Sequence, residues 1–556
     1  MLMLTMTAVG LKRFLERVMN KKNRSPLEYV TLSVLALLVG AILKYPNRAI
    51  GTHDRPDLKG ERGLPLIGNL ISFIRSGRDP LGYRLEAFRK YGPVNTLTVP
   101  IFGRFIFVNT PEHMQYLLKD NFENYIKGST FQRRLIDLLG RGIFIVNGTQ
   151  WKIHRKTASN IFTTRLYRDL VQGAFKATAA DLSDALDKTV DRGTYIDLQN
   201  EFLKLTLDAF GRLTFGLDFQ ALKTEGHNEF GDAYDYMTNH IESRATNPFW
   251  RLTEMLRPGK RREIRTAIAT VDRYAMKAIE ARRAETPEQS ESRPRDLLDH
   301  FIKYQYEDGS MLTDVELRDV FVNFMIAGRD TTAQTLSWMF YMLLIHPDVL
   351  AKLREEMEIV FPGGSSDNFK YETFANELPY SKAVFYETVR LYPAVPKNAK
   401  YVVEDDVLPC GTPVHKGDLV GFSNFCMARN TDVWGPDAAV YRPERWLDMP
   451  SPETVAGANA DASAQKANKS PFGKFRNEST FKFPNFNAGP RICLGQTFAT
   501  LEALVTTVYL LQRFDFHMAP NQPIPVPKPA VTMPMRDPFM VGVTRRQRDA
   551  TALVDV

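Results

Sequence analysis

Ten residues near the C-terminal end of the chain, from Phe486 to Gly495, combine one cysteine with two glycines and an arginine. They read F-N-A-G-P-R-I-C-L-G and lead into an apolar stretch with a helical pattern. Amide dipoles at the start of such a helix, together with the nearby Arg491, favour the thiolate form of Cys493. Gly489 and Gly495 allow backbone N–H groups to approach the sulfur closely. A lone thiolate held in this way suits a haem iron better than zinc, which takes four ligands.

A second group of small and polar residues, A-G-R-D-T-T, occupies positions 327–332 in the middle of a long predicted helix. Ala327 and the glycine after it leave room against a flat ligand. Asp330 and Thr331 offer a carboxylate and a hydroxyl to a small polar species. A threonine beside a glycine that leaves the carbonyl four residues earlier unbonded can also open the helix and admit water. A close helix crossing at small residues is the alternative interpretation, and it stays open.

Trp151 and Arg155 are four residues apart and follow a turn at Asn147-Gly148. They share one face of a predicted helix, and together with His154 they could bind a carboxylate in a cleft. An ordinary amphipathic helix would show the same spacing.

Glu387 and Arg390 are three residues apart on another predicted helix and therefore share a face. The segment P-E-R-W, which contains Arg445, follows some fifty residues later. An ion network of this glutamate with the two arginines would fix a long irregular segment in place, which gives specificity more than net stability. The E-x-x-R pair alone is a common surface feature.

The elements that must position these residues are mostly helical. The longest predicted helix runs over 312–345, begins with the capping box Thr313-x-x-Glu316 and ends at His346-Pro347. Strand-like runs occur at 94–99, 105–108 and around 402–420. The pattern predicts a mainly α fold with a small β region. Residues 451–470, rich in Ala, Ser, Asn, Asp and Lys, indicate a surface loop with no assigned function.

The first 62 residues are typical of a membrane-targeting and anchoring segment. Residues 1–25 predict a basic amphipathic helix, 26–45 a transmembrane anchor, 46–62 a hinge, and 63–556 the catalytic domain. The uncharged run from Tyr29 to Leu43 is short for a span, and Lys44 can reach the membrane surface. A mitochondrial presequence is the alternative for the Arg-rich start.

Composition excludes several classes. The chain has 556 residues, a net charge of +8 and three cysteines, which are too few for a disulfide scaffold or a Cys-rich metal cluster. The catalytic part is therefore expected to face a reducing compartment. The mild positive charge suits an anionic membrane surface or an acidic protein partner. No nucleic-acid partner is expected, because no basic stripe is interleaved with aromatic residues.

Taken in order, the patterns W-x-x-x-R, A-G-x-D-T, E-x-x-R, P-E-R-W and F-x-x-G-x-R-x-C-x-G resemble the cytochrome P450 family of haem-thiolate monooxygenases. The resemblance extends from residue 63 to about residue 542, and only the cysteine pattern is highly specific by itself. It implies the mainly α triangular-prism fold of that family, with a small β region and the structural ion triad Glu387, Arg390 and Arg445. Segments 324–332, 394–396, 403–409 and 486–496 are similar to fungal and plant hydroxylases that attack the terminal carbon of alkanes and fatty acids. The usual Met-His-Arg run before P-E-R-W reads Met-Ala-Arg at 427–429.

The resemblance also implies a role for each matching residue. Cys493 would be the axial ligand of the haem iron, Thr331 would hydrogen-bond dioxygen and Asp330 would help to deliver protons. Animal terminal hydroxylases commonly carry a glutamate at the position of Ala327, and that glutamate forms an ester with the haem. Alanine cannot form this bond, so the haem b is expected to be bound non-covalently. Lys400 stands where the family usually has an arginine; it keeps the charge without the bidentate fork. The residues expected to contact the haem are Cys493, Trp151, His154, Arg155, Lys400, Phe486, Gly489, Arg491, Gly495 and Ala327.

The expected partners follow from the same resemblance. The stretch after the Cys493 motif is too short for a flavin domain and offers no iron–sulfur cysteines, so electrons are expected to come from a separate NADPH–cytochrome P450 reductase. Lys474, Arg476 and Lys482 are candidates for docking its acidic surface, and a solvated loop is the alternative. A single-pass anchor in the endoplasmic reticulum membrane with a cytosolic catalytic domain is expected.

The expected reaction is hydroxylation of unactivated C–H bonds in long-chain fatty acids or alkanes. Candidate substrate contacts are the aromatic and apolar stretches 122–140, 247–250 and 534–539 together with Phe324, although core packing would account for each of them. Two alternatives remain: a broad-range monooxygenase of aromatic or xenobiotic compounds, and a haem-binding sensor or carrier without turnover. The acid–alcohol pair Asp330-Thr331 argues against the carrier.

Overall fold

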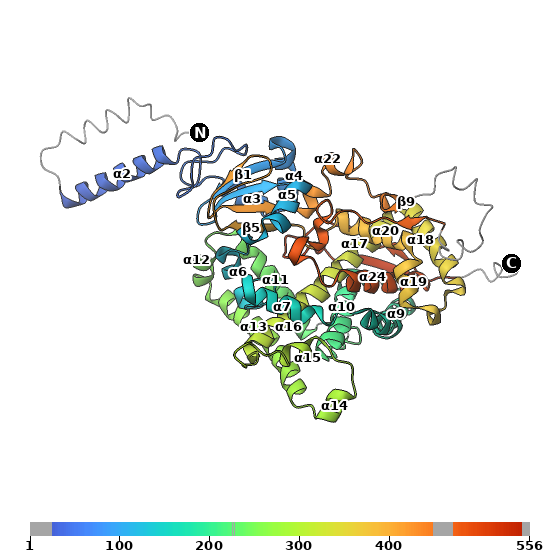
Figure 1. Ribbon diagram of the computed structural model, residues 1–556. Helices are drawn as coiled ribbons and strands as arrows, with labels where there is room; N and C mark the ends of the chain where they lie inside the picture. Colours follow the sequence, from blue (N-terminus) through green and yellow to red (C-terminus); the bar gives the residue numbers. More distant parts are fainter. Residues whose placement is uncertain (1–24, 225, 227, 449–470, 548–556) are drawn as a thin grey trace.

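The computed structural model describes residues 25–224, 226, 228–448 and 471–547, and helices make up most of it (Figure 1). The predicted mainly α fold with a small β region is confirmed. The longer helices are α2 (Pro26–Lys44), α4 (Pro80–Tyr91), α6 (Ser129–Leu139), α7 (Gly148–Ser159), α9 (Phe175–Arg192), α10 (Leu198–Phe215), α11 (Glu229–Thr246), α13 (Pro258–Arg283), α16 (Asp314–Met325), α17 (Thr331–Ile345), α18 (Pro347–Val360), α20 (Pro379–Leu391) and α24 (Gln496–Leu511).

The largest sheet lies at the end of the molecule from which α2 projects (Figure 1). Its strand order is β1-β2-β8-β5-β3; β2 and β8 run parallel, and the other pairs run antiparallel. The predicted strands at 94–99 and 105–108 are confirmed, and the run around 402–420 resolves into four shorter strands. The strands are β1 (Val94–Val99), β2 (Gly103–Val108), β3 (Tyr125–Ile126), β4 (Ile196–Asp197), β5 (Asn398–Val402), β6 (Asp406–Val407), β7 (Pro413–Val414), β8 (Leu419–Phe422), β9 (Leu447–Asp448), β10 (Lys474–Phe475), β11 (Phe514–Met518) and β12 (Met540–Arg545).

A helical rod from Asp314 to Ile345 crosses the centre of the molecule. Its start carries the predicted capping box, in which Thr313 and Glu316 bond reciprocally, and it ends at His346 as expected. The rod is not uniform, because a wider π turn, η4 (Ile326–Asp330), separates α16 from α17. Such turns occur mostly as single insertions in α-helices, frequently at functional sites.

The predicted ion network is present and fully buried. Glu387 accepts hydrogen bonds from Arg390 Nε at 2.7 Å and from Arg445 Nε at 2.9 Å. Arg390 also donates to the carbonyl of Ala438 at 2.7 Å, and the Trp446 indole donates to Glu387 at 3.0 Å. The network joins α20 to the irregular segment before and within the turn η7 (Pro443–Trp446). Because each charge in it is partnered, removal of any one would leave a buried ion uncompensated.

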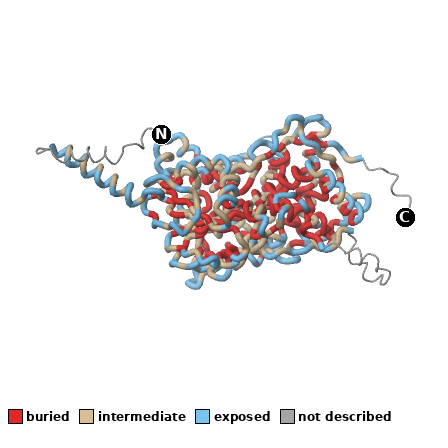
Figure 2. Tube along the Cα trace, turned by 90° about the horizontal axis from the view of Figure 1, so that it is seen from above, coloured by how far each residue is buried: buried red, intermediate tan, exposed pale blue. Residues whose placement is uncertain are grey.

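Helix α2 stands away from the body and is exposed along its length, whereas the body has a continuous buried interior (Figure 2). Within the described residues it is the one helix long and apolar enough to cross a membrane, with a mean hydropathy of 2.0. Residues 46–62 are not helical, and they are held to the body by bridges from Ala49 to Leu66 and from Gly60 to Thr96. The predicted amphipathic helix, apart from Ser25, and the whole 451–470 loop lie outside the described residues.

Candidate active site

The cysteine loop forms a compact turn between the short helix η9 (Pro484–Phe486) and α24. The Cys493 N–H donates to the Phe486 carbonyl at 2.8 Å, which closes the loop. Gly489 has a φ of +60°, and a Cβ there would collide with the carbonyl of Leu118. Glycine is therefore required at this position by the neighbouring π turn η1 (Tyr116–Asp120) and by the left-handed backbone. Gly495 has an ordinary φ of −89°, so the loop does not depend on its missing side chain.

The Cys493 thiol experiences opposing electrostatic influences. Burial raises its pKa, whereas a hydrogen bond from the Gly495 N–H and the charge of Arg155 lower it. Cys493 is nevertheless an exposed residue, so its side chain is not fully covered by the surrounding protein. A metal cation in that opening would be the largest local charge and would deprotonate the thiol. Within the described residues, no group of three His, Cys, Asp or Glu side chains could hold a metal by itself.

Several cations gather beside the cysteine loop. Arg155 on α7 donates to the carbonyl of Ile492, next to the cysteine. The Arg491 guanidinium lies over the Trp151 ring, 4.6 Å from its centroid, and donates to the Val146 carbonyl at 2.8 Å. Lys400, on β5, is buried, and burial together with the charges of Lys127 and Arg491 holds its pKa well below the usual range. The structure thus brings together Trp151, Arg155, Lys400 and Arg491 from α7, β5 and the cysteine loop.

Two residues that the sequence patterns did not single out complete this cluster. Lys127 donates to Asn398 Oδ1 at 3.0 Å, and burial, followed by the charge of Arg491, lowers its pKa to about 7. Phe122 lies against Trp151, with ring centroids 5.6 Å apart, and its ring is 6.0 Å from Lys400 Nζ. Both fall in the 122–140 stretch, but no local spacing distinguishes them, because their neighbours come from distant parts of the chain.

In the part of the chain that the structure describes, none of the four cations Lys127, Arg155, Lys400 and Arg491 forms a salt bridge with a carboxylate, although Glu123 attracts the charge of Arg491. Among the described residues Lys400 Nζ is buried without a hydrogen-bond partner. An uncompensated buried ammonium is costly, which indicates that an anionic group belongs beside it. A haem would supply two carboxylates at this cluster and an iron at Cys493. The side chains present therefore fit the haem that the sequence predicts.

The central rod turns two side chains toward an opening. From Leu317 to Leu343 every residue is buried except Ala327 and Thr331, which are one turn apart on the same face. The Thr331 hydroxyl donates to the Ala327 carbonyl at 2.6 Å, so an opening of the helix through a free threonine hydroxyl is not present at this position, although a π turn widens the helix here. Gly328 faces the other way, and a Cβ there would collide with the Phe210 ring of α10. The helix-crossing interpretation applies at Gly328, and room for a flat ligand beside the partly buried Ala327 stays a prediction.

Asp330 is buried and turned toward α11 rather than toward the opening. Its carboxylate accepts from Arg329 Nη1 at 2.9 Å, and Arg329 also pairs with the partly exposed Asp235 at 2.6 Å. Burial raises the pKa of Asp330 to about 6, although Arg329 opposes the shift. This carboxyl group therefore exchanges a proton near neutral pH.

His154 does not join the cluster around Cys493. Its ring lies edge-on to Phe301 at 6.0 Å, and burial lowers its pKa to about 4. The reason is helical geometry: Trp151 and Arg155 share one face of α7, and His154 is turned toward α15 (Leu297–Ile302) and α16. Contact of His154 with a haem stays a prediction that this placement does not favour.

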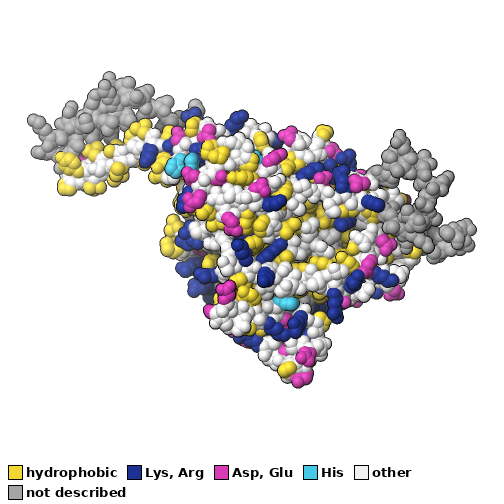
Figure 3. Space-filling view, viewed as in Figure 1, with side chains coloured by type: hydrophobic (Ala, Val, Ile, Leu, Met, Phe, Trp, Pro, Cys, Tyr) yellow, Lys and Arg dark blue, Asp and Glu magenta, His cyan; other side chains and the backbone are white. Residues whose placement is uncertain are grey.

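The remaining predicted site residues have mixed surroundings. Phe486 packs among aromatic side chains, including Tyr386 at 5.9 Å. Phe324 and Phe539 are buried in the main core, which favours packing over substrate contact. Phe249 is 42% exposed. Outside these stretches, exposed hydrophobic side chains also lie along α2 (Figure 3).

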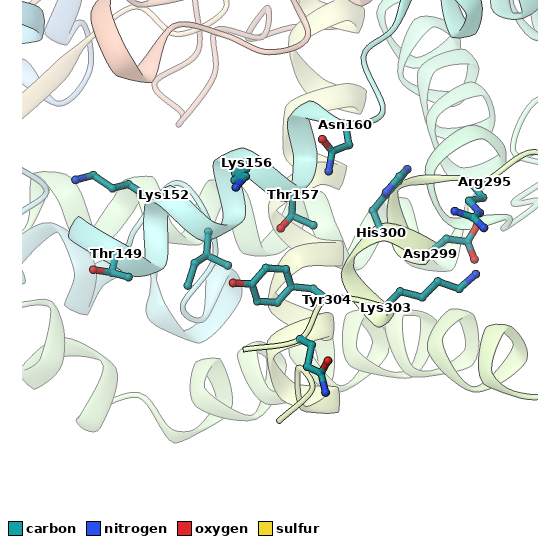
Figure 4. A pocket seen from close by; sticks show the side chains of 12 residues that line it. Thr149, Lys152, Lys156, Thr157, Asn160, Arg295, Asp299, His300, Lys303 and Tyr304 are labelled. Atoms are coloured by element: carbon teal, nitrogen blue, oxygen red, sulfur yellow. The ribbon is translucent and has the colours of Figure 1, made fainter. Parts of the chain in front are cut away.

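A groove of about 540 Å³ lies between α7 and the segment that contains α15, and Cys493 does not line it (Figure 4). Lys152 and Lys156 of α7 line one side of this groove, and residues of α15 and the loop after it line the other. Arg295 and Lys303 add positive charge, and Asp299 is paired with Arg282 and Arg293. None of the predicted site residues lines the groove, so it is an outer cationic surface rather than the reaction site.

Comparisons with known proteins show the family of this chain. The family model described as cytochrome P450 matches residues 58–541. The chain is 35% identical over 538 residues to cytochrome P450 monooxygenase cyp1 of Mycosarcoma maydis, covering 92% of this chain and 80% of that protein. It is 33% identical over 502 residues to cytochrome P450 704B1 of Arabidopsis thaliana, covering 84% and 91%, respectively. Cytochrome P450 86B1 of the same plant is 34% identical over 450 residues, covering 78% and 76%.

Proposed function

This chain belongs to the cytochrome P450 family of monooxygenases, and we propose that it is a membrane-anchored enzyme that hydroxylates unactivated C–H bonds of long-chain fatty acids or alkanes. The observation that carries the proposal is the meeting of one cysteine loop with four cations that form no salt bridge within the described residues, of which Lys400 also lacks a hydrogen-bond partner. The similarity of segments 324–332 and 486–496 to terminal hydroxylases supports the choice of aliphatic substrates. Relatives from a fungus and a plant are consistent with that subgroup.

Each residue of the site would have a defined task. Cys493 would ligate the iron, and Trp151, Arg155, Lys400, Arg491 and the newly found Lys127 would hold the haem carboxylates. When bound, the haem supplies the redox chemistry that activates dioxygen for insertion of one oxygen atom into a C–H bond. Ala327 has no carboxyl group to form an ester, so a non-covalent haem b is proposed.

Proton delivery would fall to Asp330 and Thr331. A general acid is most effective when its pKa lies near the working pH, and the pKa of Asp330 is about 6. Arg329 connects this carboxyl group to Asp235 on the surface. The Thr331 oxygen borders the opening and has a lone pair available because its proton is donated to the Ala327 carbonyl.

A membrane location is proposed on the strength of α2. Nineteen helical residues extend for about 28 Å, close to the ~30 Å thickness of a hydrocarbon core. A single-pass anchor in the endoplasmic reticulum membrane would leave the catalytic domain in the cytosol, the reducing side. Fractionation of cells that express the full chain tests this, and a mitochondrial fraction would favour the presequence alternative.

A separate NADPH–cytochrome P450 reductase is the proposed electron donor. Of the three basic residues considered from the sequence, Arg476 and Lys482 each pair with Glu478, at 3.2 and 3.1 Å, and Lys474 is exposed. Their net charge toward a partner is therefore smaller than the sequence suggested. The cationic groove of Figure 4 offers a second attraction for an acidic surface.

Spectroscopy and turnover test the proposal together. Wild-type protein should give the carbon monoxide difference spectrum of a thiolate-ligated haem, and Cys493→Ala should lose it. Cys410→Ala, which removes an exposed cysteine, should keep it. With reductase and NADPH, dodecanoic acid should be hydroxylated faster than a polycyclic aromatic. The reverse preference would favour the xenobiotic alternative, and an absence of NADPH consumption would favour the carrier.

A further inference from the structure

Arg134 on α6 is an arginine with two donor atoms that are buried and unused among the described residues. Among the described residues, its Nε and Nη2 atoms are buried without a hydrogen-bond partner. The guanidinium group lies flat over the Phe102 ring, with its central carbon 4.0 Å from the ring centroid. A buried charged donor without a partner is costly and calls for an explanation.

The two unused atoms form one edge of the guanidinium plane. This protein shows what that edge binds. Arg55 donates through Nε and Nη2 to the two oxygens of Asp57, at 2.9 and 2.7 Å. Arg244 donates in the same way to Glu254, at 2.7 and 3.1 Å. The fork of a guanidinium matches the geometry of a carboxylate, so the free edge of Arg134 is suited to a carboxylate from outside the chain.

The carboxylates of the chain near Arg134 are already paired. Glu242 lies close enough to attract the Arg134 charge, but its carboxylate accepts a hydrogen bond from Lys397. Asp137 and Glu254 both pair with Arg244. The neighbouring Arg133 adds a like charge. Burial is the largest influence on Arg134 and lowers its pKa to about 10, so the group stays positive at neutral pH.

The position of α6 relates Arg134 to the reaction site. The next turn of α6 rests on the start of the central rod, where Arg318 donates to the Leu138 carbonyl at 2.6 Å. Along the rod, Arg318 and Thr331 are thirteen residues apart, which corresponds to about 20 Å. An extended long-chain fatty acid spans a separation of this order. A carboxylate at Arg134 would therefore leave the far end of the chain beside Thr331 and Ala327.

We propose that Arg134 binds the carboxylate of a fatty-acid substrate and thereby selects free acids over alkanes. This inference rests on the proposed function. Phe102 covers the guanidinium face, and the free edge has no accessible surface in this structure, so the incoming carboxylate must displace packed side chains. The arrival of a bidentate partner offsets that displacement, since it satisfies a buried charge that otherwise has none. Fixing one end of the substrate also fixes which carbon reaches the reaction site.

The test uses the haem-loaded full chain and compares a charged with an uncharged ligand. Dodecanoic acid, its methyl ester and dodecane are titrated spectroscopically into wild type, Arg134→Gln and Arg133→Gln. Arg133 is the matched control because it is exposed and removes the same charge one position away. Arg134→Gln should weaken binding of the acid about tenfold or more and change binding of the ester and alkane less than twofold. Arg133→Gln should leave all three close to wild type.

Product analysis supplies a second readout. In Arg134→Gln, hydroxylation of dodecanoic acid should spread over more carbon positions, because the carboxylate is no longer held. Arg134→Lys should give an intermediate result, since it keeps the charge and loses the fork. Retention of the wild-type absorbance spectrum reports that each variant is folded.

Three outcomes overturn the inference while leaving the proposed function intact. Two are an equal loss for acid and ester in Arg134→Gln, and an equal loss of acid binding in Arg133→Gln. The third is a wild type that binds the ester and alkane as tightly as the acid. A wild type that hydroxylates none of the three ligands would instead refute the proposed function, and this inference with it.

Discussion

Replacement of Lys400 by methionine should affect the haem-free and haem-bound proteins in opposite directions. The Lys400 ammonium group is buried, has no hydrogen-bond partner among the described residues and lies near Lys127 and Arg491. Without haem, the folded state bears the cost of this unpaired charge. With haem, the same ammonium would hold a carboxylate. Methionine fills a similar volume and carries no charge.

The size of each effect follows from the contacts. An unsatisfied buried polar group costs about 1–3 kcal/mol, so Lys400→Met should raise the unfolding free energy of the haem-free protein by roughly that amount. A hydrogen bond to a charged group contributes about 1.5–3 kcal/mol, so the variant should release haem about 10- to 100-fold faster.

The pH dependence has a definite sign. The pKa of Lys400 in the folded protein lies below its unfolded value of about 10.4. Between those two values the unfolded chain binds the additional proton, so the stability of the haem-free wild type rises with pH in that window. Lys127, with a pKa of about 7, acts in the same direction from about pH 7 upward. In Lys400→Met this rise should be smaller.

Urea unfolding of haem-free protein at pH 7 and 9, together with the rate of haem transfer to an excess of a haem-free globin, measures both effects. Lys188→Met, an exposed substitution on α9, is the control for loss of one charge and should change neither quantity. The reasoning is refuted if Lys400→Met destabilises the haem-free protein, or if haem loss is no faster than in Lys188→Met.

Three further predictions follow from individual contacts. Thr331→Ala should keep haem but divert electrons from product to peroxide, measured as peroxide per NADPH; tight coupling would count against the proton relay. The coupled product yield of wild type should fall as pH rises through about 6, because only protonated Asp330 donates, and Asp330→Asn should flatten that profile. Glu387→Gln should lower stability by about 3–5 kcal/mol, since two buried arginines lose their counter-charge, and urea unfolding checks this.

Short sequence patterns predicted those structural features whose physical cause lies within a few neighbouring residues. The capping box at Thr313 and the end of the rod at His346 depend on residues a few positions apart, and both were predicted. The apolar run that forms α2 was found in the same way. The ion network was a hypothesis from residue types that the family resemblance strengthened, and no local spacing could settle it, because Glu387 and Arg445 come from distant segments.

Sequence patterns left open the side-chain contacts that depend on how the chain packs in three dimensions. The Thr331 hydroxyl donates to the Ala327 carbonyl beside the π turn, a contact that the residue types alone left open. His154 shares a sequence motif with Trp151 and Arg155, but the direction of its side chain around α7 takes it to Phe301. Lys127 was not predicted, because its importance comes from Lys400 and Arg491.

The sequence by itself identified the candidate thiol of Cys493, the candidate acid–alcohol pair Asp330-Thr331 and the apolar run of α2, because each depends on residue types at short spacing. Only the tertiary structure decided which cations surround the cysteine loop, which face of the rod is open, and that Arg134 has a free edge. The physical reason is that charge, burial and hydrogen-bond satisfaction depend on all neighbouring atoms. Those neighbours are brought together from α6, α7, β5 and the cysteine loop by packing of the whole chain.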